Sequence, residues 1–324
     1  MSVKQIAHLI AEDLERVEEA IATHLDTDVR FISDVSNYVL SSGGKRIRPV
    51  LLILCAQLGN YTGKRVYDLS TVIEFLHTAT LLHDDVIDKA HLRRGNPTVN
   101  SRWGNEISIL IGDYLYAKAM ELALLDKDFL VMETVSKVTK EMAKGQIIET
   151  LKQRDLTISE ADYYRIISLK TAALFEASCT IGALVAGFSP QQRGCIAAFG
   201  HHLGLAFQMA DDTLDFVAPE TTLGKPVNND LKEGKITLPI IAAVQQANAG
   251  EIACISTYLQ NAQGTDADFQ TIIAILHKYN TLQMTLDKAQ IHIDQAKAQL
   301  CGFAPSPALD TLRLLSDYVV ARDV

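Results

Sequence analysis

The sequence has few of the features that mark secreted, multidomain or nucleic-acid-binding proteins. Its five cysteines are widely spaced and form no Cys-x-x-Cys pair, so we expect neither a disulfide framework nor a zinc site. Its eight prolines are scattered and no Ser/Gly-rich linker interrupts the chain, so we expect one domain over residues 1–324. The formal net charge of −9 argues against a general nucleic-acid binder, because neutralising a phosphate backbone requires a basic surface.

Signals for export or membrane insertion are also lacking. Residues Met1 to Glu12 do not show the basic, apolar and small-residue succession of a signal peptide, and their acidic residues argue against a transit peptide. The most apolar stretch, Ala172 to Phe188, contains Glu176 and falls short of a clean membrane span, so we expect it to form a buried helix. With the isolated cysteines, these features predict a cytoplasmic protein.

Apolar residues recur at helical spacing from Val3 onward, and no sustained alternation of period two competes with them. The sequence therefore predicts an all-α fold. We expect helices over Val3–His24, Asp28–Val39, Pro49–Leu58, Val66–Asp88, Ile107–Ala123, Leu130–Leu151, Ser159–Ala186 and Pro190–Val217, with three or four more after Pro239.

Within this helical pattern the chain carries a duplicated acidic motif. Residues 84–88 read Asp-Asp-Val-Ile-Asp and residues 211–215 read Asp-Asp-Thr-Leu-Asp, so the pentad Asp-Asp-x-x-Asp recurs after 127 residues (211 minus 84). Each pentad lies in an otherwise apolar helical segment, where crowded carboxylates repel one another and resist burial unless a cation compensates them. One or more divalent metal ions are the simplest compensation.

Helical geometry places the acids of each pentad on one side of its helix. The first stripe comprises His77, Leu81, Asp84 and Asp88, with Asp85 beside it, and the second comprises Gln208, Asp211, Asp212 and Asp215. Carboxylates at i and i+4 have Cβ atoms about 5–6 Å apart, which lets them share cations. A set of oxygen ligands favours a hard ion, and Mg²⁺ typically completes its shell with water and substrate phosphate.

A solvated acidic helix face is the alternative reading of either pentad taken alone. The flanking residues argue against it, because Leu81-Leu82 precede the first pentad and Phe207, Met209 and Ala210 surround the second. Apart from the pentads these segments have little polar surface. We therefore expect two acidic helices that face each other across a metal–phosphate cluster.

Basic residues adjoin both acidic segments. The turn Gly43–Pro49 places three cations around two glycines, which suits a diphosphate held by lysine charge and by bidentate arginine donation. Arg93-Arg94 follow the first pentad by five residues. Each of these clusters is a weak signal alone, since charged turns are common, but their position beside the acids indicates a site for anionic substrate.

Two further polar residues stand on apolar helices. His77 could be a core histidine, yet it lies two turns before Asp84 on the same stripe, which favours a role as donor to a phosphate oxygen. Lys170-Thr171 interrupt the hydrophobic run Ile166 to Phe188. A lysine there needs an anionic partner if it is buried, although it could also extend to the surface.

The chain resembles the trans-isoprenyl diphosphate synthases in the order of its motifs. These motifs are the two pentads, Gly43–Pro49, Arg93-Arg94, Lys170-Thr171, Phe207-Gln208 and Gly224-Lys225. The resemblance covers essentially the whole chain and is strongest between Gly43 and Pro239. The sequence of residues 75–88, FLHTATLLHDDVID, is most similar to that of the bacterial octaprenyl diphosphate synthases of quinone biosynthesis, a branch of that family.

The resemblance implies an isoprenoid synthase-type helical bundle around a deep central cavity, usually as a homodimer. It implies chain elongation, in which Mg²⁺ assists departure of the allylic diphosphate and the double bond of isopentenyl diphosphate attacks the allylic cation. No protein nucleophile is required. Because the cation would react with water, water must be excluded, and the loop Ala218–Leu238 is the candidate lid. The hydrophobic product would be released from the enzyme during transient contact with a membrane surface.

The resemblance also assigns roles to individual residues. Metal binding and catalysis fall to Asp84, Asp85, Asp88, Asp211, Asp212 and Asp215, with Lys170 as a further catalytic residue. Isopentenyl diphosphate would be held by Lys45, Arg48, His77 and Arg94. The allylic diphosphate, farnesyl diphosphate among the candidates, would be held by Arg93, Lys170, Thr171, Gln208, Lys225 and Lys235.

Product length should depend on the helix that carries the first pentad. The tail is expected to grow along the stripe before Asp84, past Ala79 and Thr80 and then Leu76 and Ile73. In the family, bulky aromatic residues near Ala79 and Thr80 block the tunnel and give short products. The small residues here therefore predict a C40 product first and C45 second, with a floor near Met120–Leu124 and Met132–Val135.

One local departure and three alternatives accompany this interpretation. Asn229 stands where relatives often carry a second aspartate, whereas Asp230 and Lys235 are retained. The alternatives are a shorter-chain (C15–C20) synthase, a class I terpenoid cyclase and a non-catalytic regulatory subunit. Lys45, Arg48 and six intact aspartates favour elongation over the last two, because cyclases usually lack the isopentenyl site and regulatory subunits tend to lose aspartates.

Overall fold

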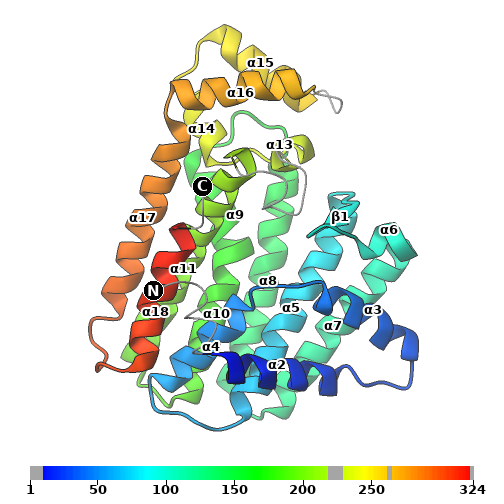
Figure 1. The fold of residues 1–324 in the computed structure, drawn as a ribbon, viewed down its shortest axis with the longest axis vertical. Helices are drawn as coiled ribbons and strands as arrows, with labels where there is room; N and C mark the ends of the chain where they lie inside the picture. Colours follow the sequence, from blue (N-terminus) through cyan, green and yellow to red (C-terminus); the bar gives the residue numbers. More distant parts are fainter. Residues whose placement is uncertain (1–9, 218–228, 261–264, 322–324) are drawn as a thin grey trace.

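The computed structural model describes residues 10–217, 229–260 and 265–321, which form a helical bundle with one short hairpin (Figure 1). In chain order the elements are α2 Ala11–His24, α3 Arg30–Ser41, α4 Ile47–Gln57, α5 Arg65–Ile87, β1 Leu92–Arg93, β2 Asn96–Pro97, α6 Val99–Trp103, α7 Asn105–Leu125, α8 Phe129–Lys152, α9 Glu160–Ile167, the π-helix η1 Ser168–Ala172, α10 Ala173–Val185, α11 Pro190–Val217, α13 Asn229–Glu233, α14 Leu238–Val244, α15 Ala249–Gln260, α16 Asp266–Lys278, α17 Thr281–Gln299 and α18 Pro307–Val320.

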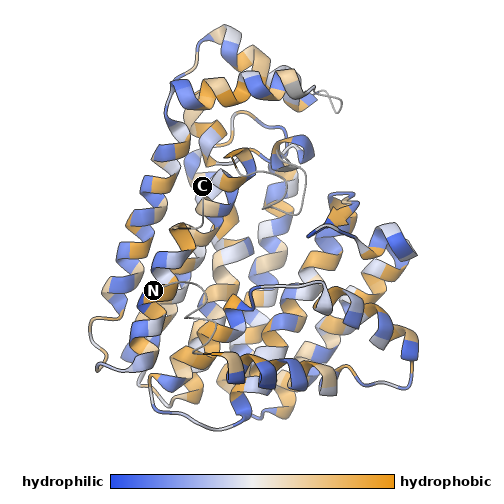
Figure 2. Cartoon of the chain, viewed as in Figure 1, coloured by the Kyte–Doolittle hydropathy of each residue, from blue (hydrophilic) through white to orange (hydrophobic). Residues whose placement is uncertain are grey.

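Four long helices, α5, α8, α10 and α11, run through the middle of the bundle (Figure 1). α17 and α18 pack along α11 at one edge, and α7 packs along α5 at the other. Figure 2 shows apolar residues throughout the central helices, whereas α17 at the edge carries many polar ones. The buried apolar residues form two clusters, one around α11 and α17 and the other around α5 and α7, and both include residues of α4 and α10.

The all-α prediction is confirmed, and the expected helices agree with the structure to within a few residues. Pro190–Val217 is reproduced as predicted, and the start expected at Val3 lies outside the described residues. The short α6, α13 and the β1–β2 hairpin were not predicted. The three or four helices expected after Pro239 correspond to α15, α16, α17 and α18 in the described part, and α14 begins just before Pro239, at Leu238. Two-residue strands and one-turn helices carry too little periodicity to be recognised.

The predicted helix Ser159–Ala186 is one helical run divided by a π-helical turn. Composition and length alone would let Glu160–Val185 cross a membrane, yet 67% of its most apolar window is buried within the bundle. The π-turn η1 carries Lys170 and Thr171, and such turns are frequently found at functional sites. The expectation of a buried helix is therefore confirmed.

Two glycines let neighbouring helices approach η1 closely. A Cβ at Gly145 of α8 would lie 2.8 Å from the backbone nitrogen of Lys170, and a Cβ at Gly204 of α11 would lie 2.6 Å from Cα of Ala172. Both distances are too short for a side chain. η1 is thus clamped between the helix of the second pentad and α8, which fixes where Lys170 points.

Candidate active site

A cavity of about 1840 Å³ opens in the bundle between α4, α5, α8, η1 and α11. Typical small-molecule pockets hold roughly 300–1,000 Å³, so this space suits a large ligand. Asp84, Asp85 and Asp88 of α5 line it, and Asp211 of α11 lines the same space. The structure therefore brings the two pentads to one cavity, although 127 residues separate them in the sequence (211 minus 84).

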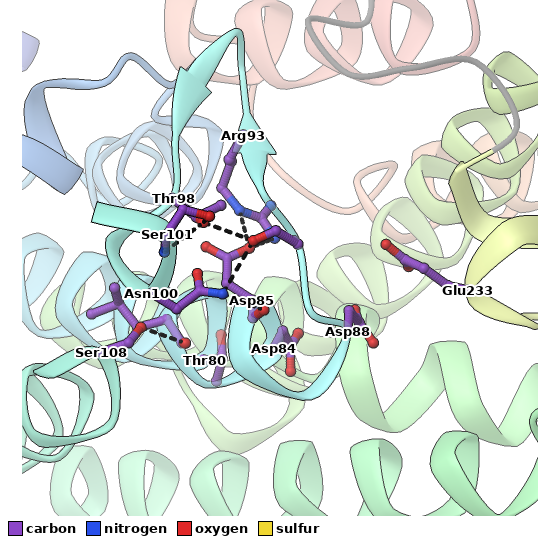
Figure 3. A network of polar contacts seen from close by, with 12 residues as sticks. Thr80, Asp84, Asp85, Asp88, Arg93, Thr98, Asn100, Ser101, Ser108 and Glu233 are labelled. Carbon is purple, nitrogen blue, oxygen red and sulfur yellow. Dashed lines mark hydrogen bonds and ion pairs between the residues drawn. The ribbon is translucent and has the colours of Figure 1, made fainter. Parts of the chain in front are cut away.

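The acids of the first pentad point in two directions. Figure 3 shows Asp85 turned toward Arg93, while Asp84 and Asp88 lie on the other side of α5. Arg93 donates from Nε and Nη2 to Oδ1 of Asp85 at 2.9 and 2.7 Å. Burial raises the pKa of Asp85 although the charge of Arg93 opposes this shift. Oδ1 of Asp85 is therefore paired with a protein cation.

Lysines approach the two remaining acids of this pentad. Lys235 donates to Oδ2 of Asp88 at 2.7 Å, and Oδ1 of Asp88 is buried without a hydrogen-bond partner among the described residues. Nζ of Lys170 lies 3.6 Å from Oδ2 of Asp84. Burial raises the pKa of the Asp84 carboxyl, and the nearby Glu149 and Asp88 add to this while Lys170 opposes it. These carboxylates thus retain capacity for a cation.

The acids of the second pentad also differ from one another. Tyr163 donates to Oδ2 of Asp212 at 2.6 Å, and Gln208 donates from Nε2 to Oδ1 at 2.7 Å. Asp215 accepts the backbone N–H of Asp230 at 3.1 Å. Asp212 lines a separate cavity of about 110 Å³, and of the three acids only Asp211 lines the large one.

The six acids expected to bind metal therefore have different surroundings in the structure. Asp84, Asp88 and Asp211 have the positions that suit metal binding. Asp85 and Asp212 are taken up by protein donors on their own side of each helix, because adjacent positions on a helix point about 100° apart. Burial raises the pKa of Asp212 well above its ordinary value, with the charge of Asp230 adding to it.

Lys170 and Thr171 extend from η1 into the cavity wall. Lys170 donates to Glu149 of α8, and Thr171 donates to Oε1 of Gln208 at 2.7 Å. Burial opposes the lysine charge, but Glu149 and Asp84 outweigh it and raise the pKa of Lys170. Thr171, Gln208 and Asp212 thus form one hydrogen-bonded chain from η1 into the second pentad.

A basic group faces the cavity from α4 and the loop before it. Arg48 contacts Nε2 of His77 at 3.2 Å and lies over the ring of Phe175, 4.8 Å from its centroid. Burial lowers the pKa of Arg48 to about 10, and its Nε is buried without a hydrogen-bond partner among the described residues. Burial also lowers the pKa of His77 well below its usual range, and Arg48 and Arg94 add to this effect. The imidazole is therefore neutral at neutral pH.

Of the other cations in the predicted anion site, some face the cavity and one is held by protein carboxylates. Arg94 adopts a left-handed backbone conformation (φ 53°), and its guanidinium lies so close to Gly44 that a Cβ there would be 3.2 Å from Nη1. Lys45 lines the cavity with Nζ 5.4 Å from the ring centroid of Tyr318. Arg46 is not available to a ligand, because it donates to Glu18 at 2.7 Å and to Glu74 at 2.6 Å.

Cations and carboxylates arranged around one large cavity agree with comparisons to known proteins. A family model described as polyprenyl synthetase matches residues 29–276. The chain belongs to this family. Octaprenyl diphosphate synthase of Escherichia coli K12 is 35% identical over 323 residues and covers 100% of both chains. Heptaprenyl diphosphate synthase component 2 of Geobacillus stearothermophilus is 32% identical over 325 residues, again with 100% of both chains covered.

Among solved structures, a polyprenyl synthase from Caulobacter crescentus CB15 in complex with calcium and isoprenyl diphosphate superposes with a TM-score of 0.95. It is 34% identical and the match covers 100% of this chain and 98% of that one. The chain is therefore a prenyltransferase with the helical fold of the polyprenyl synthases.

Three positions of this synthase were expected to control product length, and the structure places them differently. Thr80 lines the cavity and donates to the backbone oxygen of His77 at 2.7 Å. Ala79 and Leu76 are both fully buried in the apolar cluster around α5, so they lie behind the wall rather than in it. Position on the helix indicated the correct segment, but not which of two adjacent residues faces the cavity.

Several site residues could not be recognised in the sequence. Glu149 pairs with Lys170, Glu233 pairs with Lys235 at 2.6 Å, and Tyr163 binds Asp212. Tyr116 of α7 lines the cavity, and burial raises its pKa to about 12. A weak signal existed for Glu149, an acid in the apolar run 147–151. Lys225 and most of the candidate lid, residues 218–228, lie outside the described residues.

Proposed function

We propose that this polyprenyl synthase adds isopentenyl diphosphate units to an allylic diphosphate, with farnesyl diphosphate as primer, and makes octaprenyl (C40) diphosphate for a quinone side chain. One observation carries the proposal. Two groups of basic residues, one around Arg48 and one around Lys170, line the same cavity as the pentads of α5 and α11. Two anionic substrates and a metal can therefore meet in one cavity.

Magnesium is the metal that these residues would hold. The donors are carboxylate oxygens, and Oδ1 of Asp88 is buried without a hydrogen-bond partner among the described residues. In that part of the chain no three acidic or histidine side chains converge as a preformed metal shell would. Mg²⁺ does not require such a cage, because it keeps several waters and binds substrate phosphates. We propose Asp84, Asp88 and Asp211 as ligands, with bound magnesium neutralising charge on the departing diphosphate.

The remaining residues would bind and orient the two substrates. Arg48, Lys45 and Arg94 offer fixed cations to isopentenyl diphosphate, and the neutral His77 adds a hydrogen-bond donor. Lys170 and Lys235 would turn from Glu149 and Asp88 toward the allylic diphosphate. The allylic C–O bond then breaks, a C–C bond forms to the isopentenyl double bond, and a proton is lost.

The walls below the phosphate-binding residues would exclude water from the allylic cation. Leu174, Met142 and Phe207 line this part of the cavity. An apolar lining removes the water that would otherwise react with the cation. The same lining favours the growing hydrocarbon tail, since each CH₂ transferred from water contributes about 0.8 kcal/mol.

A long product follows from the size of the cavity and the small side chain at its wall. A volume of about 1840 Å³ exceeds what short substrates need, and Thr80 presents no bulky group. The relatives do not decide the length, since one of those above is named an octaprenyl diphosphate synthase and another a component of a heptaprenyl diphosphate synthase. We propose C40, with C45 as the second candidate.

A homodimer in the cytoplasm completes the proposal, with product release at a membrane surface. The outer sides of α7 and α8 expose a set of large apolar residues that a folded chain rarely leaves in water. We call this surface the α7–α8 face, and its members are Ile109, Leu110, Leu124, Leu125, Phe129, Leu130, Ile147 and Leu151. A partner of the same sequence would cover it.

Product sizing tests the function directly. Purified protein is incubated with farnesyl diphosphate, radiolabelled isopentenyl diphosphate and Mg²⁺, and the products are separated by chain length. We expect a C40 product, and no incorporation after chelation of the metal. Products that stop at C15 or C20 would refute the length, whereas absence of incorporation or release of a cyclic hydrocarbon would refute elongation.

Two substitutions serve as matched variants in this assay. Asp84→Ala removes a proposed metal ligand and should nearly abolish turnover. Asp34→Ala removes an exposed acid of α3, whose carboxylate lies 3.9 Å from Arg30, and should leave turnover unchanged. Normal activity of the Asp84 variant would contradict the metal assignment.

A further inference from the structure

The α7–α8 face is unusually apolar for a surface exposed to water. Phe129 is 78% exposed, Leu151 76% and Leu110 61%, and all three are large hydrophobic side chains. A soluble monomer rarely exposes a contiguous group of this kind, and such groups mark contacts with other proteins or membranes. The face spans two adjacent helices, which gives it the extent of an interface.

The same face also forms part of the cavity wall. Ile147 of α8 lines the cavity and is 60% exposed, and Asp113 of α7 lines it with a side chain that is 65% exposed. A residue that both lines the cavity and contacts solvent lies at an opening. The cavity therefore reaches the surface between α7 and α8, and its wall is incomplete in the single chain.

Charges on the two helices are complementary. The exposed charged residues of α7 are acidic, Glu106, Asp113 and Glu121, whereas α8 exposes Lys137, Lys140 and Lys144 against one exposed acid, Glu133. In a twofold dimer the same patch meets itself, so α7 of one chain can pack on α8 of the other. A second copy of this chain suits the face better than a lipid surface, because the negative surface potential of a membrane would repel the acids of α7, whereas α8 of a second copy places lysines against them.

We propose that a second copy of the chain packs its α7–α8 face onto this one, closes the opening at Asp113 and Ile147, and thereby contributes a wall that limits product length. This inference rests on the proposed elongation activity. Leu110 is exposed and lies one helical turn before Asp113, and with the twofold axis beside this turn of α7 the partner's Leu110 reaches the opening. Product length is then set in part by the neighbouring subunit.

Mixed dimers separate this effect from changes within one subunit. Two versions of the full chain are co-expressed with different tags, and only dimers that carry both tags are purified. One subunit is wild type, and the other carries Asp84→Ala, which removes its own activity, together with Leu110→Ala or Leu110→Trp. All product then comes from the wild-type subunit, whose own cavity residues are unchanged.

We expect the partner's Leu110→Ala to shift the main product to a longer chain by at least one isoprene unit, because it enlarges the space at the opening. The partner's Leu110→Trp should shift it to a shorter chain. The matched control is Leu125→Ala in the inactive subunit, since Leu125 is 64% exposed on the same face but roughly 22 Å farther along α7. That control should leave the product unchanged.

Several outcomes would overturn the inference without touching the proposed function. The inference would be wrong if the wild-type protein were a monomer by light scattering and still elongated normally. It would also be wrong if the product length of the mixed dimers did not depend on residue 110 of the inactive subunit. A product change of the same size with Leu125→Ala would show a general interface effect instead. If the wild-type protein forms no polyprenyl product, the proposed function itself fails.

Discussion

Replacing Asp212 by asparagine should stabilise the ligand-free protein. Asp212 is 3% exposed, and the two hydrogen bonds to its oxygens that we identify come from the neutral donors Tyr163 and Gln208. Burial raises the pKa of its carboxyl well above the ordinary value, and the charges of Asp230 and Asp211 raise it further. The ionised form therefore costs free energy in the folded state.

The expected increase in the free energy of unfolding is the difference between two opposing contributions. Removing a buried charge relieves a desolvation cost of several kcal/mol. Asparagine has one acceptor oxygen, which can keep the bond from Gln208, and its NH₂ group must instead donate to the Tyr163 hydroxyl. Two hydrogen bonds to a charged acceptor, at about 1.5–3 kcal/mol each, are thereby replaced by two neutral ones at about 0.5–1.5 kcal/mol each, which offsets roughly 2 kcal/mol of the gain. We expect the variant to be more stable by ~1–3 kcal/mol near neutral pH, or about 2 °C in melting temperature for each kcal/mol.

The stability difference between the variant and the wild type should depend on pH. A raised folded-state pKa means that the native protein binds a proton which the unfolded chain, with an aspartate pKa of about 3.9, has already lost. Stability from this group is therefore present at low pH and lost as the pH rises through the folded pKa. Asparagine cannot lose that proton, so the difference between the variant and the wild type should be small near about pH 4.5 and largest near about pH 8.

Thermal denaturation followed by circular dichroism, in chelator and at both pH values, measures this difference. The companion variant Tyr163→Phe keeps the charge of Asp212 and removes one donor, so it should be less stable than the wild type by about 1–3 kcal/mol near pH 8. If the asparagine variant were less stable than the wild type at about pH 8, or if the gain did not change with pH, the reasoning about a buried ionised Asp212 would be wrong.

Three further substitutions test other parts of the site. Lys235→Met removes the cation 2.7 Å from Asp88 and should raise KM for the allylic diphosphate about 10- to 100-fold, the equivalent of one charge-assisted hydrogen bond, with KM for isopentenyl diphosphate unchanged in steady-state assays. Arg48→Leu should raise KM for isopentenyl diphosphate by a similar factor, and an unchanged KM would contradict its role. Thr80→Phe places a ring in the cavity wall, and sizing should show products shortened toward C15–C20.

Local pattern was enough to predict most of the helices and the location of the site. The helix Pro190–Val217 has a proline suited to its first turn and sustained apolar spacing, and both signals depend only on neighbours in the sequence. The pentads were recognisable for the same reason, since acids clustered on an apolar helix stand out whatever surrounds them. Family resemblance then supplied the basic loops, which alone are indistinct from ordinary charged turns.

Contacts between distant segments could not be predicted in this way. Tyr163 and Asp212 are 49 residues apart, and Lys235 and Asp88 are 147 apart, so only the packing of α9 against α11 and of the 230–237 segment against α5 brings them together. The same limit explains Ala79, because the rotation of α5 about its axis decides whether Ala79 or Thr80 faces the cavity. Helical periodicity gives the relative angle of two residues, not the absolute direction of either.

The ion pairs of the ligand-free site bear on how its ligands would bind. Lys170 and Lys235 are mostly buried and face four acids, Glu149, Asp84, Asp88 and Glu233. If a metal ion alone took Asp84 and Asp88, each lysine would keep one acid, Glu149 or Glu233, and lose the other in a poorly solvated wall, which costs free energy. A diphosphate supplies new anions for both lysines at the same moment. Flexible lysine stems can make that exchange, whereas the planar fork of Arg93 remains on Asp85. Metal and allylic diphosphate should therefore bind with positive coupling, each more tightly in the presence of the other.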